Sequence, residues 1–317
     1  MHLIPRFFRR TPYIAETDFA GTVVAVGTSV PVSPPNDQAD SITQHGIGIG
    51  TKTFGSIPVP VHLSGSGALA EYLAIETKHI TPIPSTLSLA QASTLPVSAI
   101  TALDVVSLCN PQSGQRILIN SPTGGVGSFA TQLLRRAVGS EGVIVGICSQ
   151  AGAGLARELG CDEVGDYGNY CDGSSVYERL EVYCREHGRF DAVVDCYGSQ
   201  MLWGWSESLL KEGREGVYAT VGPRFPSMSY WGMLVVLWQM MGNMLRPRWM
   251  GGVDRTYRQA ASFIDEEKFD KVRKLAENGV IKPVVGEAFA FEDAKEVSTS
   301  LFYVLISRSM VVCVCVC

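Results

Sequence analysis

The sequence predicts an α/β protein in which a parallel sheet, covered by helices on both faces, accompanies a smaller β-rich domain. Two observations support this fold class. Between about residues 90 and 223, continuous apolar strands alternate with helices, as in a parallel sheet that is buried on both sides. Residues 11–90 are instead rich in Val, Ile, Thr, Gly and Pro and contain only short β-like runs, which is typical of a small β-rich domain.

The expected elements follow in order. We predict β-like runs at 22–26 and 72–75, and then strands at 116–120, 143–148, 163–167, 190–196 and 217–221. Helices are predicted at 127–138, 153–159, 178–186 and 265–278, and the chain ends in the β-like run VVCVCVC. The resulting domain boundaries are 1–95 for the β-rich part, 96–250 for the parallel-sheet part and 251–317 for a return to the first domain.

Composition excludes several classes of protein. A chain of 317 residues with 46% hydrophobic side chains has ample material for buried cores in about two domains. Its 26 basic and 31 acidic residues give a net charge of −5, which argues against a nucleic-acid partner. The nine cysteines are odd in number and form no C-x-x-C, so they indicate reduced thiols in a cytoplasmic protein. Arg6, Arg9 and Arg10 leave a mitochondrial location open.

The glycine-rich turn SPTGGVG, at residues 121–127, lies directly between a predicted strand and a predicted helix. Gly124 and Gly125 would let a pyrophosphate approach the backbone, and Gly127 would let the helix pack closely against the first strand. The positive end of the helix dipole and its free N–H groups favour phosphate binding. An ordinary strand–helix turn has the same local pattern, but the regularly spaced strands that follow favour a dinucleotide cofactor.

The end of the second parallel strand predicts which dinucleotide binds. An NAD site normally places Asp or Glu there to hold the ribose hydroxyls. This strand ends in Cys148 and Ser149 without an acid, so the sequence favours NADP(H). Tyr167, at the end of the next strand, is a candidate contact for the same 2′-phosphate or a cover for the adenine, although a half-buried strand-end aromatic is an equal alternative.

Several motifs occur together and in a characteristic order along residues 11–295. They are PYIAETDFAGTVVAVG from residue 12, LAEYLAI from 69, LPVSAITA from 95, GQRILINSPTGGVGSFATQLL from 114, ELGCDEVGDY from 158, FDAVVDCYG from 190 and GVIKPVV from 279. In this combination the chain resembles the medium-chain dehydrogenase/reductase superfamily, in its zinc-free quinone oxidoreductase-like branch.

This resemblance implies a Rossmann-type domain and a GroES-like β-rich catalytic domain, with the nicotinamide between them. It also implies roles for matching residues. Thr123, Gly125 and Val126 would contact the pyrophosphate, Ser149 and Tyr167 would lie beside the 2′-phosphate, Gly198 near the ribose, and Thr101 near the nicotinamide. No His, Asp and Ser constellation requires an acid–base or nucleophilic assignment, so no catalytic residue is named.

The chain departs from the family pattern at both ends. It begins close to the D-x-A-G motif, so we expect an N-terminally shortened, incomplete GroES-like domain. None of the five histidines stands in a Gly-His-Glu element, so no metal site is expected. Cys313, Cys315 and Cys317 could form a soft-metal site, but a terminal strand is the favoured interpretation.

These features support three hypotheses about function. The leading one is an NADPH-dependent oxidoreductase that passes a hydride to a quinone, an enone or another activated double bond of a small-molecule substrate. A second is a catalytically impaired NADPH-binding protein, if the missing strands carried the substrate site. A third is a trans-acting enoyl reductase of a biosynthetic pathway, which works on a carrier-bound substrate.

The uncharged, largely apolar segment at residues 228–245 is at the lower limit for a membrane-spanning helix. Trp231, Leu234, Val235 and Trp238 recur at helical spacing and would share one face. We expect this face to be buried against the protein or a partner subunit. A homodimer contact is favoured over peripheral contact with a membrane.

Overall fold

A computed structural model of the chain describes residues 14–27, 47–168, 175–222, 230–245, 253–261 and 264–294. The described residues divide into two compact units, one within 1–100 and 263–317 and the other within Thr101–Ser262. We predicted boundaries after residues 95 and 250. Helix α3 (Pro96–Cys109) runs through the first division of the chain, between residues 100 and 101.

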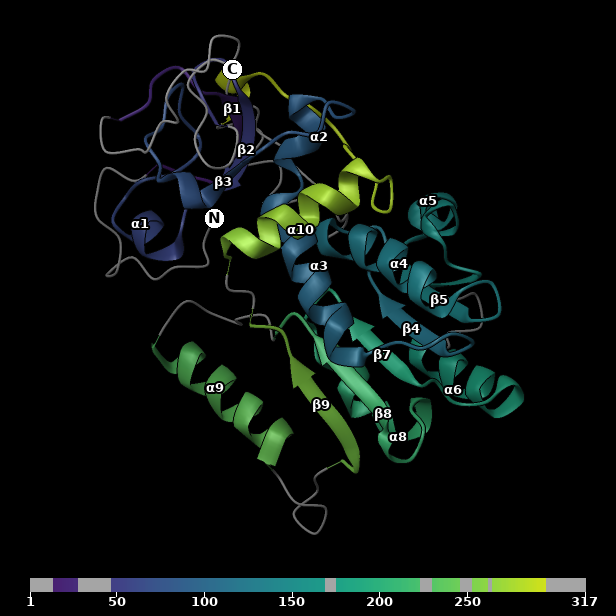
Figure 1. Cartoon of the computed structure of the whole chain (residues 1–317). Coiled ribbons are helices and arrows are strands. Elements are labelled where there is room, and N and C mark those ends of the chain that lie inside the picture. Colours follow the sequence, from purple (N-terminus) through teal and green to yellow (C-terminus); the bar gives the residue numbers. More distant parts are fainter. Residues whose placement is uncertain are drawn as a thin grey trace. The chain divides into compact units, whose positions relative to one another are not determined.

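The second unit contains a six-stranded parallel sheet with strand order β6-β5-β4-β7-β8-β9 (Figure 1). Its strands are β4 (Arg116–Asn120), β5 (Val143–Cys148), β6 (Glu163–Asp166), β7 (Ala192–Asp195), β8 (Gly213–Thr220) and β9 (Arg255–Gln259). The central strands are almost wholly buried, which confirms the interpretation of their continuous apolar runs.

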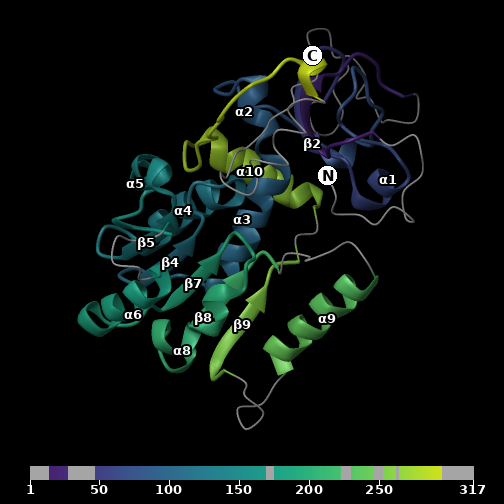
Figure 2. The same ribbon diagram turned by 180° about the vertical axis from the view of Figure 1, so that it is seen from behind.

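Helices cover both faces of this sheet (Figures 1 and 2). On one face, α6 (Val176–His187), α7 (Met201–Gly204) and α8 (Ser206–Leu209) share a buried apolar cluster with strand residues such as Leu118 and Val193. On the other face lie α4 (Gly125–Val138) and α5 (Ala153–Leu159). Alternation along β5 separates the two faces, since Val145 and Ile147 belong to the cluster and Gly146 approaches Pro122 and Cys161.

The first unit is built on a three-stranded antiparallel sheet of β1 (Asp18–Thr22), β2 (Lys52–Ser56) and β3 (Ile80–Pro82). Its helices are α1 (Val59–Leu63), α2 (Leu89–Ser93) and α10 (Glu266–Glu277), with short 3₁₀ turns at Thr77–His79 and Phe291–Asp293. Phe269 of α10 packs edge-on against Phe54 of β2, with ring centroids 6.2 Å apart. This contact joins the C-terminal helix to the N-terminal sheet.

Strands β4 and β5 and helix α5 have the predicted bounds. Helix α6 begins earlier than predicted because Ser175 and Glu178 form a capping box, in which each side chain binds the other residue's backbone N–H. Helix α4 begins at Gly125 rather than at residue 127, because Gly124 serves as its extended N-cap.

Two other expectations were wrong, and one strand was missed. The strand predicted at 22–26 is β1, at Asp18–Thr22, and Val24 beyond it is exposed. Residues 72–75 form no strand, and Tyr72 is exposed. Strand β9 was missed because, of its five residues RTYRQ, only Tyr257 is buried, so it carries no apolar run. The predicted terminal strand and the three terminal cysteines lie outside the described residues.

Helix α9 (Tyr230–Leu245) precedes the edge strand β9. Gly232 and Val236 are buried, and Asn243 donates to the Gln200 side chain at 3.1 Å. The predicted common face is instead largely exposed, with Trp231 78% and Trp238 69% accessible to solvent. Among the residues that the structure describes, nothing covers most of this face. No helix among the described residues is long and apolar enough to cross a membrane.

Candidate functional site

The carboxyl ends of β4 and β7 mark the point at which the strand order reverses direction. From β4 the chain proceeds outward to β5 and β6, and from β7 it proceeds the opposite way to β8 and β9. In open α/β sheets, ligands bind outside the carboxyl ends of the strands at this kind of switch point. The glycine-rich turn directly follows β4 and therefore lies at this position.

The glycine-rich turn is tightly packed. Ser121 adopts a left-handed conformation, with φ +63°, and accepts a hydrogen bond from the Gly124 N–H through its carbonyl oxygen. A Cβ placed on Gly127 would lie 1.8 Å from that same carbonyl oxygen, so only glycine allows α4 to approach the turn. The predicted packing role of Gly127 agrees with this geometry.

The first turn of α4 provides free N–H donors. Its first helical hydrogen bond is from the Ser128 N–H to the Gly124 carbonyl, so the N–H groups of residues 125–127 precede the helical ladder. Gly125 and Val126 are partly exposed, as is Thr123 in the preceding turn. Three donors and the positive end of a 14-residue helix dipole thus converge on one partly open position.

Ser149 and Tyr167 lie at adjacent strand ends. Cys148 of β5 and Asp166 of β6 are paired in the parallel register. Ser149 directly follows Cys148, and Tyr167 directly follows Asp166. The Tyr167 N–H donates to the Cys148 carbonyl, and the Tyr167 side chain is 53% exposed. The parallel register therefore brings together two residues that are 18 positions apart in the sequence.

Charges of both signs reach this corner of the sheet. The pKa of Cys148 is raised to about 11, mainly by burial and also by the charge of Asp166, while the charge of Arg157 opposes the shift. Asp166 also accepts the Gly168 N–H at 2.9 Å. Arg157 is exposed on α5, so a cation lies near the strand end that the sequence showed to lack an acid.

Asp195 is a buried carboxylate that we did not single out from the sequence. It ends β7, and its Oδ1 accepts from the Asn120 side chain at 2.8 Å and from the Tyr197 and Gly198 backbone N–H groups. Its Oδ2 accepts from the Tyr218 hydroxyl at 2.8 Å. The sequence did contain a signal that could have identified this pair. Asp195 and Asn120 are polar residues that end the buried apolar strands FDAVVD and RILIN.

The remaining candidates differ in position. Gly198 is buried in the turn after β7 and has φ +74°, a conformation that favours glycine. Thr101 is buried within α3 rather than at a strand end. The strand ends thus bring together eight of the nine predicted residues, which follow β4, β5, β6 or β7 and are Thr123, Gly124, Gly125, Val126, Gly127, Ser149, Tyr167 and Gly198.

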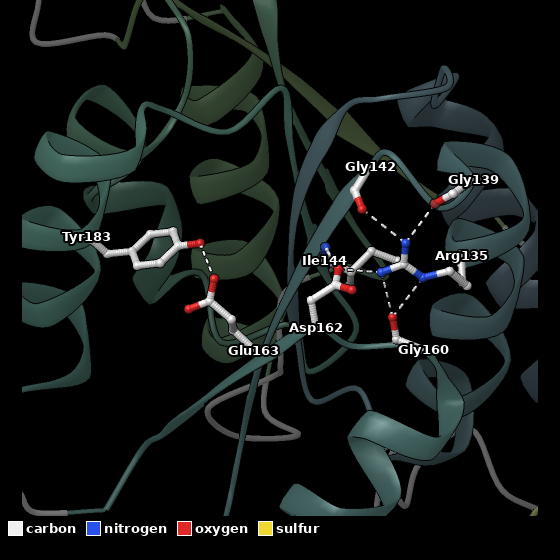
Figure 3. Close-up of polar contacts among 8 residues, drawn as sticks. All are labelled: Arg135, Gly139, Gly142, Ile144, Gly160, Asp162, Glu163 and Tyr183. Atoms are coloured by element: carbon white, nitrogen blue, oxygen red, sulfur yellow. Dashed lines mark hydrogen bonds and ion pairs between the residues drawn. The ribbon is translucent and has the colours of Figure 1, made fainter.

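A second polar cluster lies at the amino ends of the strands, where β5 and β6 begin, and thus at the opposite end of the sheet from the candidate site (Figure 3). The Arg135 guanidinium, from α4, donates to the carbonyls of Gly139, Gly142 and Gly160 and pairs with Asp162. Asp162 also accepts the Ile144 N–H at 2.7 Å. This cluster satisfies carbonyls at the ends of two helices, which is a structural role.

Within the part of the chain that the structure describes, no group of three or more His, Cys, Asp or Glu side chains could hold a metal ion.

Residues 159–299 match the family model described as zinc-binding dehydrogenase. Over 316 residues the chain is 27% identical to a trans-enoyl reductase, poxH, of Penicillium oxalicum, which covers 92% of this chain and 77% of that protein. It is 29% identical over 239 residues to the mitochondrial NAD(P)H oxidoreductase RTN4IP1 of Homo sapiens, covering 73% of this chain and 57% of that protein.

Among solved structures, the fold is similar to that of a quinone oxidoreductase from Coxiella burnetii. The TM-score is 0.65 at 21% identity, and the match covers 96% of this chain and 80% of that one. The parallel sheet, the glycine-rich turn at its switch point and these similarities agree with the motifs quoted above. Together these similarities support an oxidoreductase of the medium-chain dehydrogenase/reductase superfamily.

Proposed function

We propose that the protein is an NADPH-dependent reductase that transfers a hydride to a quinone, an enone or another activated double bond. The observation that carries the proposal is the glycine-rich turn and α4 N-terminus at the switch point, next to a β5 end without an acid. A nicotinamide cofactor is supported by the similarity to an NAD(P)H oxidoreductase.

The residues of the turn fit a dinucleotide pyrophosphate. The N–H groups of Gly125 and Val126 are free of the helical ladder, and the partly exposed Thr123 offers a hydroxyl. Gly124 and Gly127 keep side chains out of a turn that has no room for them, since a Cβ on Gly124 would lie 2.8 Å from the Ser121 hydroxyl. Anion binding here depends on backbone donors and the helix dipole.

We assign the 2′-phosphate to the Ser149 and Tyr167 corner. A neutral hydroxyl at the end of β5 can donate to a phosphate oxygen, whereas an aspartate would repel it. Arg157 contributes a nearby positive charge, because it lies close enough to Cys148 to lower the pKa of that thiol. Gly198 would lie by the ribose, and Thr101 would contact the nicotinamide.

When bound, the reduced nicotinamide supplies the hydride, and the product takes up one proton. The chain then needs to bind and orient the two reactants and to exclude water from them. We assign no catalytic residue.

A trans-acting enoyl reductase is the second candidate, and the similarity to a trans-enoyl reductase over 92% of this chain favours it. The two candidates share the cofactor and the hydride step and differ in the acceptor. A protein that binds NADPH without turning it over is the remaining alternative.

Absorbance at 340 nm decides among these proposals. We expect the protein to consume NADPH with 9,10-phenanthrenequinone or a 2-alkenal. Consumption only with a carrier-bound enoyl thioester would identify the second candidate. Binding of NADPH without consumption across all three acceptor classes would contradict both reductase proposals and leave a cofactor-binding protein.

A further inference from the structure

Asp195 joins three strands at the switch point. From the last residue of β7 it contacts the last residue of β4, the turn that follows β7, and Tyr218 of β8. The carboxylate is fully buried and accepts four hydrogen bonds. Burial and the nearby Asp195 raise the pKa of Tyr218 well above its ordinary value, so the hydroxyl remains protonated and donates.

The contacts of Asp195 lead to both turns that frame the proposed cofactor site. Asn120 directly precedes the glycine-rich turn that begins at Ser121. On the other side, the Tyr197 and Gly198 N–H groups fix the turn in which Gly198 adopts its positive φ. One carboxylate oxygen, Oδ1, accepts from both sides, so the position of either turn depends on the same atom.

We propose that Asp195 is a positioning residue that holds the glycine-rich turn and the turn at Gly198 in register for the dinucleotide. This inference rests on the proposed function. In this proposal Asp195 would not contact the cofactor itself. It would act through the backbone of the two turns that are proposed to contact it. Misplacement of such groups by a fraction of an ångström weakens binding, because the pyrophosphate and the ribose are bound together.

The same strand provides a matched control. Asp191 immediately precedes β7 and is a partly buried carboxylate at the other end of the strand. It accepts the Arg116 N–H at 2.9 Å and pairs with Lys211. Its removal should destabilise the same sheet without affecting either turn at the carboxyl edge.

The experiment measures the dissociation constant of NADPH by fluorescence titration, together with the melting temperature, for Asp195→Ala and Asp191→Ala. We expect Asp195→Ala to raise the dissociation constant about tenfold or more, since hydrogen bonds to a charged group are lost. Asp191→Ala should change it less than about twofold at a comparable loss of melting temperature. In turnover, KM for NADPH should rise in Asp195→Ala while KM for the acceptor stays unchanged.

Two further variants keep the test decisive if Asp195→Ala does not fold. Asp195→Asn retains an amide oxygen for the three N–H donors and should recover most of the NADPH affinity. Asn120→Ala removes only the link from β4 and should weaken NADPH binding several-fold. An unchanged affinity in folded Asn120→Ala, or equal losses in Asp195→Ala and Asp191→Ala, would overturn the positioning role. A wild-type protein that binds no NADPH would overturn the proposed function itself.

Discussion

At the scale of single residues, the environment of a side chain determines its protonation and its selectivity. Asp18 begins β1, and its Oδ2 accepts the Val97 N–H at 3.0 Å, in the first turn of α3. Burial raises the pKa of Asp18 from 3.8 to about 6, although the hydrogen bonds from the Val97 N–H and the Thr17 hydroxyl favour the charged form.

This raised pKa predicts a pH dependence of stability. Between about pH 4 and 6 the folded state holds a proton on Asp18 that the unfolded state has released, so the free energy of unfolding falls as the pH rises. The loss is at most about 3 kcal/mol, since one pKa unit corresponds to about 1.4 kcal/mol. Asp18→Asn should abolish this part of the slope in urea unfolding from pH 4 to 8. An identical slope in the variant would contradict the buried, protonated state.

Ser149 should set the cofactor preference. Ser149→Asp would place a negative charge against the 2′-phosphate and a ribose-binding carboxylate at the end of β5. We therefore expect NADPH affinity to fall by about tenfold or more and NADH affinity to hold or rise. Parallel titrations with both cofactors measure the ratio. The control is a serine on the surface of another helix, Ser107 of α3, which is exposed. Ser128 of α4 would not serve as a control, because it is buried. A Ser107→Asp variant should leave the ratio unchanged.

At the scale of elements, two glycines of one turn should respond differently. Gly125 is partly exposed at the start of α4, so Gly125→Val should remove NADPH binding and leave the fold largely intact. Gly127→Ala would force a Cβ against the Ser121 carbonyl, so it should destabilise the fold as well. Cofactor titration and thermal unfolding of the two variants separate these effects.

Arg135→Ala is the control for this pair. It removes the hydrogen bonds shown in Figure 3 at the opposite end of the sheet, so it should lower the melting temperature and spare NADPH affinity. Unchanged NADPH affinity in folded Gly125→Val would mean that the turn is only structural.

The elements also show what sequence patterns can predict. Strands β4, β5 and β7 were predictable because a strand buried on both faces must be continuously apolar. The polar edge strand β9 was not, since only Tyr257 faces the core. The predicted site was also incomplete, because it lacked Asp195. The four hydrogen-bond donors to Asp195 come from strands 75 and 23 residues away and from the turn that follows it. Local periodicity carries no information on such pairings.

At the scale of the whole molecule, the exposed face of α9 predicts an association. Trp231, Leu234, Val235, Leu237, Trp238 and Met241 are each more than half exposed. Together they offer an apolar area of roughly several hundred Å², which approaches the ~800 Å² that each partner buries in a standard interface. Because Tyr230–Leu245 contains no charged residue, a second copy of the same face is a complementary partner.

We therefore expect a homodimer by size-exclusion chromatography with light scattering, and a monomer for the double variant Trp231→Gln/Trp238→Gln. The variant should retain NADPH binding, since α9 carries none of the residues proposed to contact the cofactor. A monomeric wild type that cosediments with liposomes would contradict the dimer and identify α9 as a membrane-contacting face.

The central claim is that the carboxyl edge of the parallel sheet binds NADPH in preference to NADH. Its most direct test is the fluorescence titration of the unmodified protein with each cofactor under the same buffer and salt conditions. The structure and the β5 end, Cys148 and Ser149, predict saturable binding of both cofactors, with NADPH the tighter by about tenfold or more. Tighter binding of NADH, or no saturable binding of either cofactor, would contradict it.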